Sequence, residues 1–214
     1  MNYRVGLSGG IGTGKTTVAA LFQEQGIAVI DSDAISHQLT QAGGAAIPAI
    51  MQKFGKEYLN ELGALDRARM RGLVFSNGEA KQQLEAIMHP LIRAEMLAQA
   101  QAAAHAPYVM LVIPLLFEAK NFRELVQRTL VVDCPEQTQV ARTVRRSGLT
   151  DGEVRAIMAQ QISRTERLKL ADDVICNDRG IDELRAQVEN LHRFYLSRSS
   201  ESVYHPSGTP AQGG

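Results

Sequence analysis

The feature that most constrains this chain is the glycine-rich stretch at residues 9–17, GGIGTGKTT, which directly follows an apolar run at residues 5–7. It matches the phosphate-loop pattern G-x-x-x-x-G-K-[ST], with Lys15 and Thr16 at its end. Glycines are needed there because the backbone must turn tightly so that successive amides face one anion. A strand-like run precedes the motif and a helical pattern follows it, as a phosphate loop requires. The sequence therefore predicts a nucleoside triphosphate site.

Short apolar runs alternate with longer helical patterns along the chain. The predicted strands are residues 4–8, 28–31, 109–113, 129–133 and 173–176. The predicted helices are residues 14–25, several within 34–104, then 136–146, 151–170 and 182–198. Nearly continuous apolar strands are typical of a parallel sheet that is buried on both faces. The alternation predicts an α/β fold: a doubly wound parallel sheet of five strands.

The spacing of these elements also predicts the domain organisation. About 75 residues separate the second and third strands, far more than one crossover helix needs. We expect a single folded domain over residues 1–198, followed by a disordered tail over 199–214, where Ser, Gly and Pro are frequent. Within that domain the core is 1–33, 105–135 and 171–198, a helical acceptor-binding region is 34–104, and a lid is about 136–170.

Composition excludes several broad classes of function. Lys plus Arg and Asp plus Glu each number 23, so no net charge favours binding to nucleic acid or to an acidic membrane. No apolar run reaches the roughly 18 residues of a membrane span, and no signal-peptide pattern is seen at the start, so we expect a cytoplasmic protein. Cys134 and Cys176 lie in or beside apolar runs without a CxxC partner, which favours two buried thiols over a disulfide or a metal site.

The phosphate loop leaves three reactions open: a GTP-hydrolysing switch, a mechanical ATPase and a kinase for a small acceptor. A guanine-specific switch usually carries N-K-x-D and D-x-x-G, and neither pattern occurs. A mechanical ATPase needs an acidic pair at a strand end to hold Mg²⁺ and activate water. Asp133 stands alone at such an end, before Cys134 and Pro135, which favours a turn residue over a magnesium ligand.

The end of the second strand favours the kinase. Asp31 and Asp33 follow the apolar run 28–30, at the carboxyl edge where open α/β sheets bind ligands. Phosphoryl transfer to an alcohol needs a group that orients the hydroxyl and accepts its proton, and we assign this role to Asp33. Asp31 either contacts the Mg²⁺ shell through water or caps the following helix, since aspartate is a preferred N-cap.

The chain resembles the dephospho-coenzyme A kinases from residue 3 to about residue 196. The segments that carry the resemblance are LSGGIGTGKTT, VIDSD, HPLIR, VIPLLFE, LVVD and ADDVICN, in this order. The resemblance implies a P-loop kinase fold with acceptor-binding and lid regions. It also implies transfer of the γ-phosphoryl group of ATP, with Mg²⁺, to the ribose 3′-hydroxyl of dephospho-coenzyme A, the final step of coenzyme A synthesis. No nucleic acid, membrane or obligate protein partner is expected.

The donor side of the predicted site comes from the phosphate loop and from the lid. Residues implied to bind ATP are Gly10, Gly12, Thr13, Gly14, Lys15, Thr16, Thr17, Arg146 and Asn177. The hydroxyl of Thr16 is the expected Mg²⁺ ligand. Residues 120–170 hold ten Lys or Arg against six Asp or Glu, which suits a lid over a triphosphate. Arg142 and Arg146 share a helix face there, and we expect Arg142 and Lys15 to stabilise the transferred phosphoryl group.

The acceptor side rests on scattered positions. The predicted substrate-binding residues are Ser8, Asp31, Asp33, His89, Arg93, Leu116 and Glu118. The HPLIR segment is predicted to begin a helix, because proline is tolerated in a first helical turn, with Arg93 placed to meet an acceptor phosphate or ribose. The family often has threonine where this chain has Ser8, and alanine where it has Ser32. Ser32 should point away from Asp31 and Asp33 if the strand persists through these residues.

Overall fold

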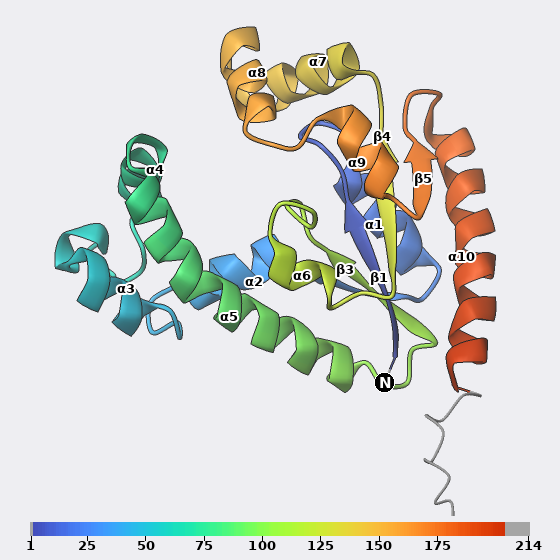
Figure 1. Cartoon of the computed structure of the whole chain (residues 1–214), viewed down its shortest axis with the longest axis horizontal. Coiled ribbons are helices and arrows are strands. Elements are labelled where there is room, and N and C mark those ends of the chain that lie inside the picture. Colours follow the sequence, from blue (N-terminus) through green and yellow to red (C-terminus); the bar gives the residue numbers. More distant parts are fainter. Residues whose placement is uncertain (1, 204–214) are drawn as a thin grey trace, which may run out of the picture. The chain divides into compact units, whose positions relative to one another are not determined.

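A computed structural model describes residues 2–203 of the chain and contains a five-stranded parallel sheet (Figure 1). The strands are β1 (Tyr3–Ser8), β2 (Ala28–Asp31), β3 (Tyr108–Val112), β4 (Arg128–Asp133) and β5 (Asp173–Cys176). Their order in the sheet is β2-β3-β1-β4-β5. Each predicted strand agrees with the observed one to within one residue at each end, and the predicted α/β class is confirmed.

Helices and turns cover both faces of the sheet. The helices are α1 (Lys15–Glu24), α2 (Ser32–Leu39), α3 (Ile47–Phe54), α4 (Arg67–Ser76), α5 (Gly78–Ala102), α6 (Lys120–Arg123), α7 (Glu136–Ser147), α8 (Asp151–Ala159), α9 (Arg164–Leu170) and α10 (Ile181–Val203), with a 3₁₀ turn at Lys56–Tyr58. Val5 and Leu7 of β1 are fully buried in one apolar cluster with α1 and α10. Gly6, which alternates to the other face, meets Leu116 and Val126. The sheet is therefore doubly wound.

The strand order positions the site. β1 is central, and the chain leaves it through α1 toward one edge, whereas β4 lies on its other side. Open α/β sheets bind ligands at such a switch point, beyond the carboxyl ends of the strands. The chain divides into two compact units, one formed by residues 1–30 with 100–214 and the other by residues 31–99. The phosphate loop belongs to the first unit and α2 to α5 belong largely to the second.

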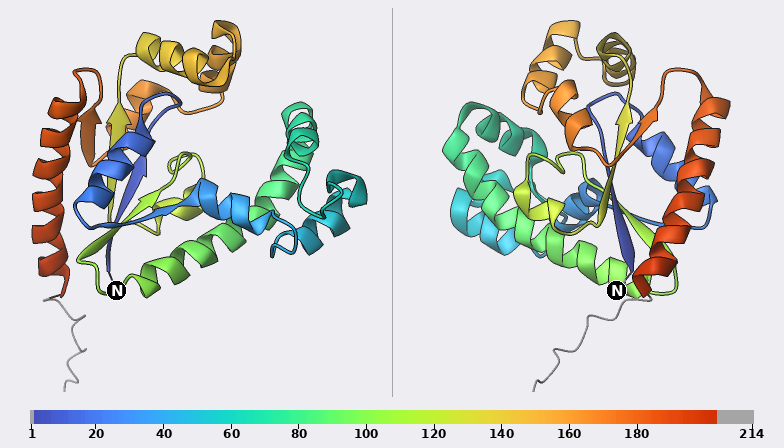
Figure 2. Two further views of the ribbon diagram at one scale, coloured as in Figure 1. Left: turned by 180° about the vertical axis from the view of Figure 1, so that it is seen from behind. Right: turned by 45° about the vertical axis from the view of Figure 1, so that its right-hand side comes forward.

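The predicted helix 151–170 is wrong, because the structure has two helices there. α8 ends at Ala159 and α9 begins at Arg164. Ser163 caps α9 in a capping box with Glu166, and this reciprocal bonding starts a new helix. The spacing Ser-x-x-Glu was readable in the sequence. Both views of Figure 2 show α7 and α8 as a pair beyond the carboxyl end of β4.

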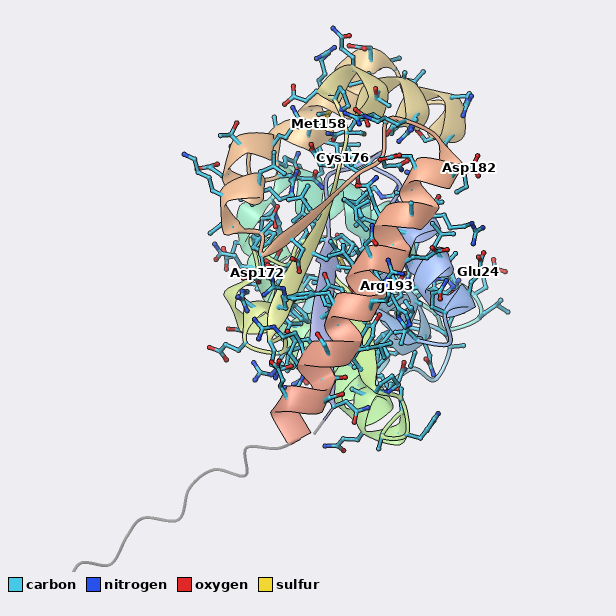
Figure 3. The ribbon with its side chains drawn as sticks, turned by 90° about the vertical axis from the view of Figure 1, so that its right-hand side faces the viewer. Glu24, Met158, Asp172, Cys176, Asp182 and Arg193 are labelled. Atoms are coloured by element: carbon cyan, nitrogen blue, oxygen red, sulfur yellow. The ribbon has the colours of Figure 1, made fainter. Side chains whose placement is uncertain are left out.

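The predicted end of the last helix is also wrong. α10 continues through residues 199–203, which were expected to be disordered, and the rest of that predicted tail lies outside the described residues. In this last part of α10 the serine hydroxyls bond back to the preceding turn: Ser199 donates to Leu196 O at 2.8 Å and Ser200 donates to the same carbonyl at 3.0 Å. Figure 3 shows α10 lengthwise, with α1 beside it near Glu24.

The HPLIR segment does not begin a helix. It lies inside α5, with Pro90 in the helix interior. Proline there removes one backbone hydrogen bond, a cost of about 3 kcal/mol in an isolated helix. Met88, Ile92 and Met96 are buried at four-residue spacing on one face of α5, and this packing offsets the loss.

One of the two cysteines is not buried as the sequence predicted. Cys134 is buried, but Cys176 is exposed, because it lies on the edge strand β5, where alternate side chains face solvent. Neither cysteine is in a disulfide. Among the described residues, no helix is both long and apolar enough to cross a bilayer.

Candidate active site

The backbone between β1 and α1 has the shape that the glycines predicted. Gly12 and Gly14 have φ angles of 76° and 94°, in the region that side chains disfavour. Gly14 is the N-cap of α1, so the helix begins at Lys15 with its first amides directed toward the loop. A tight loop that leads into a helix N-terminus is a general anion site.

Polar side chains of the loop lie over its own backbone. Lys15 Nζ donates to Gly9 O at 2.7 Å and to Gly10 O at 3.1 Å. Thr13 is buried, and its hydroxyl donates to Gly10 O at 2.9 Å. Thr16 and Thr17 are exposed in the first turn of α1. The ammonium and the exposed hydroxyls therefore lie at the open side of one loop, where a triphosphate and its metal ion would need them.

Helix α7 packs against the phosphate loop at Gly12. A β-carbon on Gly12 would lie 2.3 Å from Gln139 O and 2.6 Å from the Thr143 hydroxyl. Arg142 and Arg146 fall at the spacing that places them on the same helix face as these two contacts. Arg142 is half-buried, with Nη1 3.9 Å from the Cys134 sulfur, and Arg146 is exposed. α7 thus carries both predicted arginines along the face that meets the loop.

Asn177 connects β5 to the loop. Its side-chain Nδ2 donates to Thr13 O at 2.8 Å, and a β-carbon on Gly14 would lie 2.2 Å from that nitrogen. The Asn177 backbone N–H donates to Asp133 O at 2.8 Å, which secures the other end of the residue. Asn177 therefore helps to hold the phosphate loop, and its predicted binding of ATP stays a prediction.

Asp133, for which the sequence left the role open, forms an ion pair with Arg164. Its two carboxylate oxygens accept from Arg164 Nε at 2.8 Å and from Nη2 at 2.6 Å, the paired geometry that arginine favours. Only 6% of Asp133 is exposed. The pair raises the pKa of the Arg164 guanidinium. Asp133 thus anchors α9 to the end of β4.

The acidic pair after β2 lies in the second compact unit. Asp31 ends the strand and caps α2, because its Oδ1 accepts from the Asp33 N–H at 2.8 Å. Helix α2 begins at Ser32, so the strand does not persist and the expected alternation of Ser32 does not apply. Asp33 is exposed in the first helical turn. The cap therefore turns Asp33 outward on a rigid element.

The other acceptor candidates of this unit share one helix. His89 and Arg93 are four residues apart on α5, both half-buried, so they lie on the same helix face. Proline between them removes a backbone bond without ending the helix. α5 thus presents an imidazole and a guanidinium side by side.

Three predicted acceptor residues lie in the first unit, near the turn that follows β3. Ser8 is buried, and its hydroxyl donates to Pro114 O at 3.1 Å. Leu116 is fully buried, 2.9 Å from the position of a β-carbon on Gly6, which gives it a role in the core. Glu118 Oε1 accepts from the Ile162 N–H at 3.1 Å. The turn is therefore tied to β1 and to the linker between α8 and α9.

Sequence reasoning missed several residues around the loop. Gln139, Thr143 and Arg167 are buried beside it, at 2%, 1% and 5% exposure. Their only signal was a polar residue on the face of an amphipathic helix, which usually marks solvent. Gln139 Nε2 donates to Cys134 O at 2.9 Å, and this bond satisfies the buried amide.

The fold is that of a P-loop kinase. Its sheet is parallel, a glycine-rich loop follows the central strand, a lysine lies over that loop, and the neighbouring helix α7 carries arginines. A family model for dephospho-CoA kinase, CoaE, matches residues 3–183. The chain therefore belongs to the dephospho-CoA kinase family. The predictions of an enzyme, and of a kinase with ATP as phosphoryl donor, are confirmed.

Individual relatives are similar in sequence to this chain over nearly its full length. The dephospho-CoA kinase of Nitrosospira multiformis is 48% identical over 198 residues, which cover 92% of this chain and 98% of the relative. That of Burkholderia lata is 52% identical over 195 residues, covering 91% and 96%. Among solved structures, TT1252 from Thermus thermophilus has a TM-score of 0.77 and 36% identity, covering 90% and 97%. Dephospho-CoA kinase from Campylobacter jejuni has a TM-score of 0.69 and 27% identity, covering 92% and 99%.

Proposed function

We propose that the chain transfers the γ-phosphoryl group of ATP to the ribose 3′-hydroxyl of dephospho-coenzyme A and releases coenzyme A and ADP. Family membership supports the activity, and the observation that carries the donor half is the phosphate loop between β1 and α1. Its backbone amides and Lys15 bind the outer phosphates. Arg142 and Arg146 extend this positive field from the face of α7 that meets Gly12.

Asp33 is the proposed general base. Its carboxylate is exposed at the start of α2, and the capping bond from its own N–H to Asp31 fixes the backbone that carries it. The Asp33 carboxylate accepts the proton of the ribose hydroxyl while the oxygen attacks the γ-phosphorus. His89 and Arg93, together on α5, bind the acceptor's phosphates or ribose.

The donor set also fits a magnesium ion. Mg²⁺ usually keeps several waters and binds substrate phosphates together with one or two protein oxygens. The exposed hydroxyl of Thr16 is the proposed protein ligand, and Asp31 is proposed to contact the ion's water shell. The ion, when bound, neutralises charge on the β- and γ-phosphates. A cytoplasmic location, where both substrates would be available, belongs to the same proposal.

A purified-protein assay tests the function. Coenzyme A and ADP should form in equal amounts only when ATP, Mg²⁺ and dephospho-coenzyme A are all present. Adenosine monophosphate in place of dephospho-coenzyme A serves as a control for another nucleotide kinase with the same core. ADP that accumulates equally without any acceptor would contradict the proposal, because it would show an ATPase or a switch.

A further inference from the structure

A buried arginine that the proposed mechanism does not use lies beside the phosphate loop. Arg167 of α9 is 5% exposed, and its Nη2 donates to Ile162 O at 2.9 Å. Its Nη1 is 3.1 Å from the position of a β-carbon on Gly10. The guanidinium therefore fills the space that the missing side chain of Gly10 leaves, between the loop and the linker that joins α8 to α9.

Glu118 holds the same linker from the other side. Its Oε1 accepts from the Ile162 N–H, whereas Arg167 donates to the Ile162 carbonyl. The peptide group before Ile162 is thus bonded to an acidic side chain, and the peptide group after it is bonded to a basic one. The side chain of Ile162 has no reactive group, so the two bonds serve to fix the path of the linker.

The linker in turn reaches the phosphate loop. Gln161, adjacent to Ile162, accepts from the Ile11 N–H through Oε1 at 3.3 Å. Together with the contact between Arg167 and Gly10, this bond supports the loop at two consecutive residues. The amides of a phosphate loop must keep their directions to bind an anion. Support at Gly10 and Ile11 therefore bears on how well the loop binds ATP.

The two charged groups also depend on each other. Glu118 Oε2 and Arg167 Nε are buried without a hydrogen-bond partner among the described residues. Burial lowers the pKa of the Arg167 guanidinium, and the charges of Glu118 and Asp133 oppose this shift. Removing either Glu118 or Arg167 would leave the other charge with less compensation, so removing both should cost less than the sum of the two single losses.

We propose that Glu118 and Arg167 form a positioning pair that hydrogen-bonds both sides of Ile162. The pair thereby holds the linker between α8 and α9 against Gly10 and Ile11 of the phosphate loop. The proposal rests on the proposed function, because it assigns the pair to the donor half of that site. It gives Glu118 a part in ATP binding, distinct from the acceptor binding that the sequence predicted for it.

Steady-state kinetics with each substrate varied in turn separate these two roles. Arg167→Ala should raise the KM for ATP about tenfold and Glu118→Gln about fivefold, since a misplaced loop loses anion affinity, and a tenfold change corresponds to about 1.4 kcal/mol. Both variants should leave the KM for dephospho-coenzyme A within about twofold. Calorimetric titration with ATP alone should show the same loss of affinity without any turnover.

The double variant tests the pairing itself. Glu118→Gln with Arg167→Ala should raise the KM for ATP about tenfold, as the worse single variant does, and not by the product of about fiftyfold, because coupled partners are non-additive. Arg185→Gln is the matched control, since Arg185 pairs with Glu24 on the surface and should change neither KM. Arg167→Lys, which keeps the charge, should recover part of the ATP affinity and replaces Arg167→Ala if the latter fails to fold.

Three results would overturn the proposal. If Glu118→Gln raises the KM for dephospho-coenzyme A and leaves ATP binding unchanged, Glu118 is an acceptor ligand. If the effects of the two substitutions multiply, or if both variants bind ATP normally, there is no positioning pair. Each outcome is measured relative to an active wild-type enzyme, so it is distinguishable from failure of the proposed kinase activity.

Discussion

The phosphate loop and the helical unit of residues 31–99 are built in different ways. The loop is supported by contacts from α7, from the linker after α8 and from the residue that follows β5, all within one compact unit. The acceptor candidates Asp33, His89 and Arg93 instead stand on two helices of the other unit, and Asp33 is exposed. The difference suggests that ATP binding depends on many mutually supporting contacts, whereas acceptor chemistry depends on single side chains.

The largest effect is expected from a substitution on the acceptor side, at the carboxylate of Asp33. Asp33→Asn keeps the shape of the side chain and removes its charge, so kcat should fall about a thousandfold, within the range of a lost general base. ATP affinity, measured by calorimetry without acceptor, should change by less than about twofold. A variant with nearly normal turnover would exclude Asp33 as the base and weaken the contrast between the two units.

The next effect tests the crowding around the loop. Gly12→Ala would bring a methyl group within 2.3 Å of the Gln139 carbonyl. Because the positive φ of Gly12 is also unfavourable for alanine, kcat/KM for ATP should fall about a hundredfold, as expected when oriented amides are displaced.

Gly26→Ala is the matched control for that change. Gly26 has a φ of 79°, almost the same as Gly12, but nothing lies within 4 Å of its added β-carbon. It should cost about 1 kcal/mol of stability through backbone strain alone, with unchanged kinetics. Equal kinetic loss in both variants would show that backbone strain, and not contact with α7, controls the loop.

A smaller effect tests whether α5 belongs to the acceptor side. Arg93→Gln should raise the KM for dephospho-coenzyme A about tenfold, the loss of one charge-assisted hydrogen bond, with kcat and the KM for ATP nearly unchanged. The exposed Arg145, on α7, supplies a surface substitution for comparison as Arg145→Gln. An increase confined to the KM for ATP would move Arg93 to the donor side.

The smallest effect concerns the support of β5, which carries Asn177 to the loop. The buried Tyr195 hydroxyl donates to Asp173 Oδ2 at 2.8 Å, and Arg128 binds both oxygens of the same carboxylate. Tyr195→Phe should therefore lower the free energy of unfolding by only about 1 kcal/mol, because Arg128 still satisfies Asp173. Denaturant unfolding measures this, and a concurrent loss of ATP affinity would show that the loop depends on β5 more than we expect.

The sequence by itself determined the strands and the phosphate loop. Both signals are local, since a short apolar run predicts a buried strand and consecutive glycines with Lys15 predict the anion site at its end. The cap at Asp31 and the capping box at Ser163 were also readable from neighbouring residues, although the box was missed and one helix was predicted in place of two.

Only the tertiary structure decided which polar residues lie inside. Pro90 looked like a helix start, but buried packing on one face of α5 carries the helix through it. Gln139 and Arg167 looked like surface residues, yet both fill the space beside glycines of the loop. The physical reason is that burial and hydrogen bonding depend on partners far away in the chain, such as Glu118 for Ile162, and no local pattern records such a partner.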